Sequence, residues 1–357
     1  MELFEEKSWT GEFFIPDDYP NRFVGTIEYS PKNGVILSCS ITGLPQHKES
    51  KILHGILSTE NNQCVKCTLI GGQFSVNDTM PGFNNGLNYI RKKIGFSCLL
   101  VGTLLDENDS VSNINFSLTN LQEFFFPKGW KDSVKYSKKP LFSVQTSYGQ
   151  IEVGNNASFK YLNKKDVAGL IYSRNSEALK ELQDCFTEID NKYPNDHFML
   201  KEDITYRISL TFDNGTSIED AYGHIAELSN LFALLICSPV YPDSIRFTKS
   251  ENDLPCSIEV YPSMGINPRT KDISIKAKSN FHMPITNARI DLASVIDNWL
   301  KVSKNYSTIV SSIQNETGFG YEHSLHGEIV LYAMQLEAIA VEENKGKDKY
   351  EYPLKTY

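Results

Sequence analysis

A hairpin pattern at residues 23–41, FVGTIEYSPKNGVILSCSI, decides the fold class. Two segments rich in β-branched and aromatic residues, Phe23–Tyr29 and Val35–Ile41, flank a Pro-Lys-Asn-Gly turn. Proline and glycine at such a turn, between alternating apolar residues, are typical of antiparallel strands with a tight connection. Because similar segments recur along the chain, the sequence predicts a large antiparallel sheet.

The other predicted strands share this composition and are separated by turn residues. In the first half they are Lys51–Ser58, Cys64–Ile70, Phe96–Leu104 and Asn113–Leu121. Further along they are Leu141–Ser147, Gln150–Val153, Ser158–Leu162, Ile204–Phe212, Ser244–Thr248 and Cys256–Tyr261. Asn77–Asn88, with one proline and two glycines, is interpreted as a flexible loop. The spacing favours an antiparallel sandwich or barrel-like sheet.

Two helices are predicted inside the β-rich region from apolar residues three and four apart. Ser176 is expected to cap the first, and one face of that helix carries Leu179, Leu182, Phe186 and Ile189. Ser217 and Asp220 form a capping-box-like start for the second. Its wide stripe, from Ile218 to Leu235, should be buried against a sheet.

Two more helices are predicted near the carboxyl end. The third runs from about Arg289 to Gln314, with one face made of Leu292, Ile296, Trp299, Val302, Tyr306, Ile309 and Ile313. The fourth runs from about Leu325 to Glu343, with one face made of Leu325, Ile329, Tyr332, Leu336 and Ile339. A lone helix of this length is marginal in water, so the last helix must dock on something.

The predicted class is therefore α+β, with a large antiparallel β-sandwich or barrel-like region, inserted helices and C-terminal helices. We expect a β-rich region at residues 1–285, which could divide into 1–150 and 151–285, and a helical segment at 286–357. The 357 residues exceed one typical domain, and 40% hydrophobic with 22% charged residues exclude a disordered or collagen-like chain.

Charge and cysteine content limit the function and the compartment. The net charge of -9 means that any nucleic-acid contact must be local. The densest apolar run, Leu231–Cys237, is too short to span a membrane, and the acidic start lacks a signal core. Seven scattered cysteines suggest no disulfide framework, so we expect a cytoplasmic protein without a membrane partner.

One local nucleic-acid candidate is the lysine-rich segment at residues 127–139. Lysines would neutralise phosphates and the aromatic rings would stack on bases of single-stranded RNA. The competing interpretation is a solvated surface loop. The candidate RNA-binding residues are Lys128, Trp130, Lys131, Lys135, Tyr136, Lys138 and Lys139.

Two clusters of metal-ligating residue types are interpreted as structural. Cys64 and Cys67 form a CxxC motif inside a predicted strand, where residues three apart point to opposite faces. His323 and His326 lie with two glutamates at the start of the last helix, without the third helical ligand of a zinc site. No metal or cofactor is expected, and no GxxxxGK[ST] phosphate loop occurs.

Short motifs arrive in a fixed order near the amino end. They are Trp9-x-Gly11-x-Phe13-x-x-Pro16, Gly25-Thr26-Ile27-x-Tyr29, Gly34-x-x-Leu37, His54-Gly55 and Thr68-Leu69-Ile70. This order resembles the amino-terminal domain of ApeA-type bacterial anti-phage proteins, in which a β-rich region precedes a HEPN ribonuclease domain. Leu331-x-x-x-Gln335-Leu336-Glu337-Ala338 is similar to the first helix of that HEPN part.

The resemblance implies the sensor or regulatory part of an abortive-infection system that controls a HEPN-type tRNA endonuclease. The implied partners are that nuclease, in cis or in trans, tRNA, a phage protein as trigger, and a further copy of the chain. The RNA endonuclease motif of the family is Arg-x4 to x6-His. None of the seven arginines of this chain has a histidine at that spacing, so no catalytic residue is assigned.

Two other classes of function remain open from the sequence. A carbohydrate- or ligand-binding β-sandwich without nuclease activity would expose an aromatic platform on one sheet face. An enzyme in its own right would bring catalytic carboxylates together in a cleft.

Overall fold

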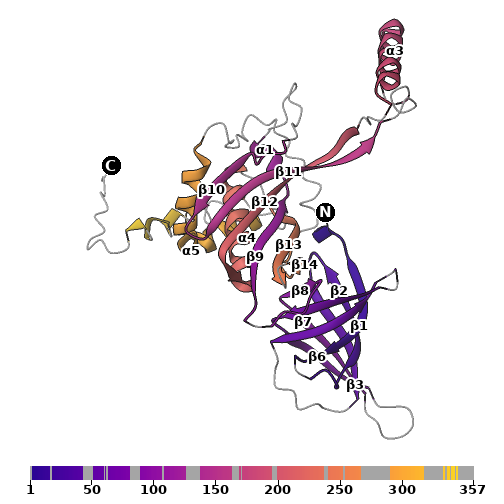
Figure 1. The fold of residues 1–357 in the computed structure, drawn as a ribbon. Helices are drawn as coiled ribbons and strands as arrows, with labels where there is room; N and C mark the ends of the chain where they lie inside the picture. Colours follow the sequence, from indigo (N-terminus) through magenta and orange to yellow (C-terminus); the bar gives the residue numbers. More distant parts are fainter. Residues whose placement is uncertain are drawn as a thin grey trace, which may run out of the picture.

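The computed structural model describes residues 2–16, 18–42, 51–59, 61, 63–80, 89–106, 108–125, 137–162, 169, 171–194, 199–236, 240–251, 254–266, 290–316, 333, 336–337, 339–341 and 343–344. Fourteen described strands form one antiparallel sheet in the order β10-β11-β12-β9-β13-β14-β8-β5-β4-β1-β2-β3-β7-β6. The described α-helices lie between strands of this sheet in the chain or follow its last strand, and one short 3-10 helix precedes it (Figure 1). The predicted α+β class is therefore confirmed.

The elements have the following bounds. The strands are β1 (Lys7–Phe14), β2 (Phe23–Ser30), β3 (Gly34–Thr42), β4 (Ile52–Ser58), β5 (Cys64–Ile70), β6 (Gln73–Met80), β7 (Tyr89–Phe96), β8 (Cys98–Val101), β9 (Ser110–Leu118), β10 (Phe142–Thr146), β11 (Gly149–Tyr161), β12 (Met199–Ser217), β13 (Pro242–Glu251) and β14 (Leu254–Pro262). The helices are η1 (Glu2–Phe4), α1 (Leu121–Phe125), α3 (Ser176–Lys192), α4 (Ile218–Ile236) and α5 (Leu292–Glu316).

The strands β1 to β8 form the curled, barrel-like half of the sheet (Figure 1). Alternation places Gly25, Ile27 and Tyr29 of β2 inward, because successive strand residues face opposite sides. The predicted turn between β2 and β3 ends at Gly34, whose φ is 71°. A Cβ there would lie 2.1 Å from Ser263 Oγ, so the turn requires glycine.

The strands β9 to β14 form the other half, which is covered by helices on one face (Figure 1). The capping box predicted for α4 is present, since Asp220 N donates to Ser217 Oγ at 3.1 Å. As predicted, the apolar stripe of α4 is buried against the sheet, where the helix contacts β9 and β12. Phe232 is 1% exposed and packs edge-on against Phe124 of α1 at 5.3 Å between ring centroids. α5 in turn packs on α4.

A two-stranded arm leaves this half of the molecule. Beyond Ser158 and Glu202, β11 and β12 pair only with each other, out to Tyr161 and Met199. They carry α3, which stands at the far end, away from the body (Figure 1). We define the arm as residues 158–202. None of its residues whose burial is described is buried.

Several predicted boundaries were wrong for identifiable reasons. The strand expected at Phe96–Leu104 breaks at Ser97 and β8 ends at Val101, because the next residue, Gly102, has a φ of 133°. The strand expected to reach Leu121 ends at Leu118, and Asn120 in a left-handed conformation leads into α1.

Other differences concern elements without a clear apolar pattern. β1, β6 and β7 were not predicted as separate strands. Residues 77–80 of the expected flexible loop belong to β6, because their backbone pairs with β7. Asn175 rather than Ser176 caps α3, since its side-chain oxygen accepts hydrogen bonds from the backbone amides of Glu177 and Ala178.

The buried face of α5 is turned relative to the prediction. Leu292, Ile296 and Leu300 are buried, whereas Val302, expected on that face, is 40% exposed. Trp299, which was expected on that face, and Ser303 contact α4, so the inward face takes in Leu300 and Ser303 and leaves out Val302.

Candidate functional site

Only the end of the lysine-rich candidate segment falls within the described residues. Lys138 and Lys139 are exposed just before β10. The backbone amide of Ser137 donates to Asn155 Oδ1 at 3.0 Å, which fixes the end of this segment to β11. The other five candidates, Lys128, Trp130, Lys131, Lys135 and Tyr136, lie outside the described ranges. The RNA contact therefore remains a prediction.

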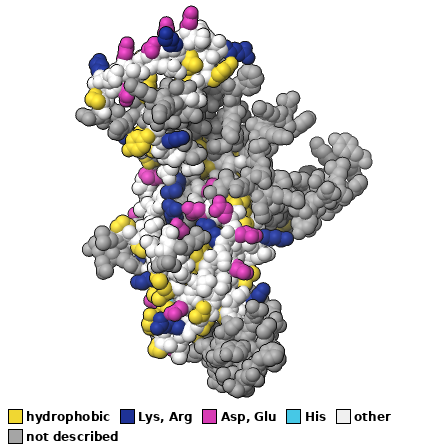
Figure 2. Space-filling view, turned by 90° about the vertical axis from the view of Figure 1, so that its right-hand side faces the viewer, with side chains coloured by type: hydrophobic (Ala, Val, Ile, Leu, Met, Phe, Trp, Pro, Cys, Tyr) yellow, Lys and Arg dark blue, Asp and Glu magenta, His cyan; other side chains and the backbone are white. Residues whose placement is uncertain are grey.

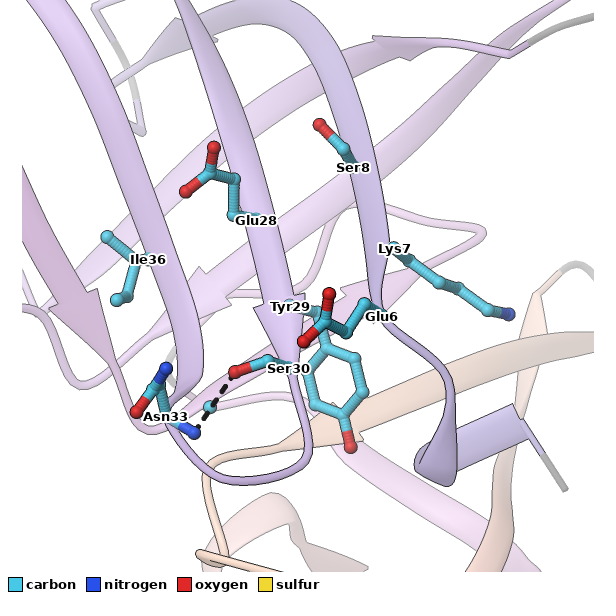
Figure 3. A pocket seen from close by; sticks show the side chains of 9 residues that line it. Glu6, Lys7, Ser8, Glu28, Tyr29, Ser30, Asn33 and Ile36 are labelled. Atoms are coloured by element: carbon cyan, nitrogen blue, oxygen red, sulfur yellow. Dashed lines mark hydrogen bonds between the residues drawn. The ribbon is translucent and has the colours of Figure 1, made fainter. Parts of the chain in front are cut away.

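A pocket of about 420 Å³ lies on the outer face of β1, β2 and β3 (Figure 3). Glu6 and Glu28 supply carboxylates, and hydroxyl and amide groups come from Ser8, Ser30 and Asn33. Lys7 also lines it, but its Nζ donates to Tyr261 Oη at 2.9 Å. The charge that faces the pocket is thus mainly negative, which disfavours a phosphate ligand.

The same pocket bears on the ligand-binding alternative. Its aromatic residue, Tyr29, is 1% exposed, because its ring points into the core and its hydroxyl donates to Leu3 O at 2.8 Å. Burial raises the pKa of this hydroxyl well above its ordinary value. The pocket therefore offers polar groups without an aromatic stacking face.

A polar cluster ties the amino terminus to the second half of the sheet. Arg246 of β13 contacts Glu2 at 3.1 Å and Glu259 of β14 at 3.8 Å. Tyr261 Oη donates to the second oxygen of Glu259 at 3.1 Å. Nearby, burial lowers the pKa of Arg207 and raises that of Asp243, whose side chain contacts Ser117. These opposite shifts show charges held in a poorly solvated place.

A second pocket, of about 410 Å³, lies where the barrel-like half meets the start of α4. We call it the junction pocket. One wall comes from β4, β5 and the residues before α4, and the pocket is lined by Lys51, Ile52, Ile70, Gly71, Ser97, Cys98, Asp106, Ser217, Ile218, Glu219 and Tyr222. Its lining combines apolar side chains, such as Ile52 and Ile70, with charged ones, such as Lys51 and Glu219, a combination that suits an amphipathic ligand.

Two groups of the junction pocket are strongly perturbed. Burial raises the pKa of the Cys98 thiol to about 12 and also raises that of the Tyr222 hydroxyl, which lies against the thiol. Both groups are therefore neutral, and Cys98 is an inert, structural thiol at physiological pH. Next to the pocket, His54 is buried, with Nε2 3.0 Å from Leu105 O.

The two cysteines of the CxxC motif face opposite sides of β5. Cys64 is exposed, whereas Cys67 is buried and burial raises its pKa to about 12. The two thiols do not share one face, as strand alternation predicted. Within the described ranges no three metal-ligating side chains gather, and His323 and His326 lie outside those ranges.

Glu227 of α4 links this helix to α5 through Trp299 and Ser303, and we call these contacts the Glu227 joint. Its backbone oxygen accepts from Trp299 Nε1 at 2.7 Å, and its carboxylate accepts from Ser303 Oγ at 2.8 Å. The same carboxylate lies 3.2 Å from His224 Nδ1. Sequence reasoning missed this joint, because a glutamate on a helix gives no signal of a partner more than 70 positions away.

The last described residues of the chain leave apolar side chains uncovered. Leu336 is 67% exposed and Val341 is 50% exposed. Tyr306 of α5 donates to Glu343 at 2.5 Å, so the chain near Glu343 lies beside the middle of α5. Leu336 was expected on a buried stripe, and it is not buried within the described part of the chain.

The fold defines the class as an α+β protein built on one antiparallel sheet, with a pocket on its barrel-like half and the junction pocket between that half and the start of α4. None of the helices in the described ranges combines the length and hydrophobicity needed to cross a bilayer. A family model named ApeA N-terminal domain 1 matches residues 8–299, from β1 into α5. The chain belongs to this family and is an anti-phage defence protein. Comparisons with curated proteins and with solved structures gave no match.

Proposed function

We propose that this chain is the sensor and regulatory part of an abortive-infection system. It holds a HEPN-type RNA endonuclease in check, in cis or in trans, and a phage protein releases that nuclease to cleave tRNA. The proposal rests on the family membership and on one structural observation, the Glu227 joint.

The Glu227 joint supports a mechanical route from the sensing half to the nuclease. α4 begins at the junction pocket and is fixed to α5 by Trp299 and Ser303. α5 leads toward the uncovered residues Leu336 and Val341. A ligand that binds one position of α4 better than another therefore shifts α5 by changing the populations of the two arrangements.

The test uses bacteria that carry the complete defence system of this chain, with Glu227→Ala as the variant. Removing the carboxylate loosens α5, so we expect tRNA cleavage and slow growth without infection. Asp297→Ala is the matched control, because Asp297 makes only an exposed pair with Lys301 on α5. Intact tRNA in uninfected Glu227→Ala cells, together with normal cleavage on infection, would contradict the proposal.

The same proposal includes an RNA contact, which we assign to the lysine-rich segment at residues 127–139. Replacing Lys131, Lys135 and Lys138 with Glu should weaken tRNA binding and reduce its dependence on salt, because fewer phosphate contacts release fewer counterions. The measurement is a tRNA titration at two salt concentrations. Unchanged binding would assign this segment to the solvated surface.

A further inference from the structure

The arm concentrates exposed apolar surface at the far end of the molecule. Fourteen large hydrophobic side chains are exposed among the described residues, and seven of them lie in the arm: Phe159, Tyr161, Ile171, Tyr172, Leu182, Tyr193 and Met199. In Figure 2 the end that carries α3, at the top, shows acidic, basic and hydrophobic side chains together. The arm thus carries half of the large hydrophobic side chains that are exposed in the described part of the chain.

The apolar residues of α3 follow the spacing of a coiled-coil seam. Leu179, Leu182, Phe186 and Ile189 are separated by three, four and three residues, which are successive a and d positions of a heptad. Such a stripe is narrower than the face of a helix that packs on a sheet. Leu182 is 45% exposed, and the other three are only partly buried. The spacing fits one partner helix.

The charges of α3 leave the seam accessible to a helix of the same sequence. The helix has five acidic and two basic residues: Glu177, Glu181, Asp184, Glu188 and Asp190, with Lys180 and Lys192. Of the five acidic residues, only Asp190 lies at a heptad position that flanks the seam. The flanking positions between the ends are Ala178, Gln183 and Cys185, which add no repulsion between two copies. Net acidity also argues against nucleic acid as the partner.

We infer that α3 pairs with α3 of a second copy of this chain, antiparallel and with a twofold axis near residue 184. In this register Leu179 lies opposite Ile189 of the second copy, and Leu182 lies opposite its Phe186. The basic last turn of one copy, at Lys192, then lies at the same end of the pair as the acidic first turn of the other, at Glu177, once at each end. A parallel pair would place like charges together at both ends. The twofold contact closes on itself and gives a dimer.

The pairing also accounts for how the arm is built. A helix of 17 residues without a buried side chain gains little stability from its own chain. A second copy would supply the missing burial of the seam. The arm holds this contact away from the pockets, so dimerisation leaves the junction pocket open to a ligand.

The first test is the mass of the full chain by sedimentation velocity between about 1 and 100 µM, a range in which a short helix pair dissociates. We expect a dimer whose dissociation constant rises at least tenfold in Leu182→Glu, because the new charge faces the seam. Asn191→Glu adds the same charge on the outer face and should behave like the wild type. Both positions are exposed, so neither variant should lower the melting temperature.

The second test identifies the surface and the direction of pairing. Cys185 flanks the seam one residue from the twofold axis, so the antiparallel pair brings the two copies of this exposed thiol close together. A short bismaleimide should therefore link two chains through Cys185, and Cys185→Ser is the control that removes the link. We expect this link in the wild type and in Asn191→Glu but not in Leu182→Glu. A monomer at every concentration, a Leu182→Glu dimer as tight as the wild type, or the absence of this link would overturn the inference. A monomeric arm that binds a purified phage protein or tRNA would overturn it as well.

Discussion

The helices α4 and α3 make opposite use of similar sequence patterns. Both are amphipathic, both are capped by a side chain, and both are inserted between strands of the same sheet. α4 buries nine residues, whereas α3 buries none. The stripe of α4 includes small and large apolar residues over a wide arc, which the sheet, α1 and α5 cover together. The stripe of α3 is limited to the a and d positions of a heptad, which fits a single helix. The width of an apolar stripe thus indicates what covers it.

The largest effect on stability is expected when an aromatic ring is removed from the buried face of α4. Phe232 is 1% exposed and its ring contacts Phe124 and Phe125. Phe232→Ala should lower the free energy of unfolding by about 3 to 5 kcal/mol, because it leaves a cavity. Urea denaturation measures this change. A loss below about 1 kcal/mol would mean that α4 is not part of the cooperative core.

The next effect concerns the joint between α4 and α5. Ser303 is 2% exposed and its hydroxyl donates to Glu227. Ser303→Ala leaves that carboxylate oxygen without a buried donor and should cost about 1 to 3 kcal/mol. Thermal denaturation compares it with Asp297→Ala, whose exposed ion pair should contribute less. Equal melting temperatures for the two variants would show that the hydrogen bond from Ser303 to Glu227 does not stabilise the contact between α4 and α5.

A smaller effect is expected from an ion pair that fixes β13 to the turn before β9. Burial tends to raise the pKa of Asp109, but hydrogen bonds and Lys249, 2.7 Å away, outweigh it and lower that pKa below its ordinary value of 3.8. A carboxyl group whose pKa is lower in the folded than in the unfolded state stabilises the fold at any pH above its unfolded-state pKa. This stabilisation is lost as the pH falls through the folded-state pKa. Asp109→Asn should therefore cost about 1 kcal/mol at pH 7.

The pH dependence supplies the control for this pair. The difference between wild type and Asp109→Asn should shrink once the pH falls below about 3.8 and disappear below the lowered pKa of Asp109 in the folded protein. Denaturation at pH 7 and at pH 3 measures both values. A difference that stays constant over this range would show that the charge of Asp109 is not what stabilises the pair.

The smallest effect belongs to the arm. Leu182 is 45% exposed, so Leu182→Ala should change the free energy of unfolding of the monomer by less than about 0.5 kcal/mol. The measurement is urea denaturation at a concentration below that of dimer formation. A loss comparable with that of Phe232→Ala would show that α3 is packed on its own chain, and would remove the contrast between the two helices.

The sequence predicts those parts of the fold in which a side-chain pattern and the backbone agree. β2 and β3 follow the alternation of a strand and α4 follows helical spacing, and the predicted stripe of α4 is buried from Ala221 to Leu235. β6 and β7 lack such a pattern and exist through backbone pairing, which side chains do not reveal. The face of α5 depends on where α4 lies, so its own spacing could not select between two adjacent ridges.

The candidate sites were harder to predict for the same reason. Lys51, Cys98 and Ile218 meet at the junction pocket although they are far apart along the chain. Their contact depends on how the two halves of the sheet meet, and no local motif encodes that. The opposite facing of Cys64 and Cys67 was predicted correctly, because alternation within one strand is a local property. The lysine-rich segment remains a prediction from composition.

The most direct test of the contrast between the two helices is amide hydrogen exchange at about 1 and about 100 µM of the full chain. We expect the backbone amides of α4 to exchange slowly at both concentrations. In α3 we expect fast exchange at the lower concentration and protection at the higher one, and Leu182→Glu should abolish that protection. Exchange in α3 that is slow and independent of concentration would contradict the account, since α3 would then be stabilised by its own chain.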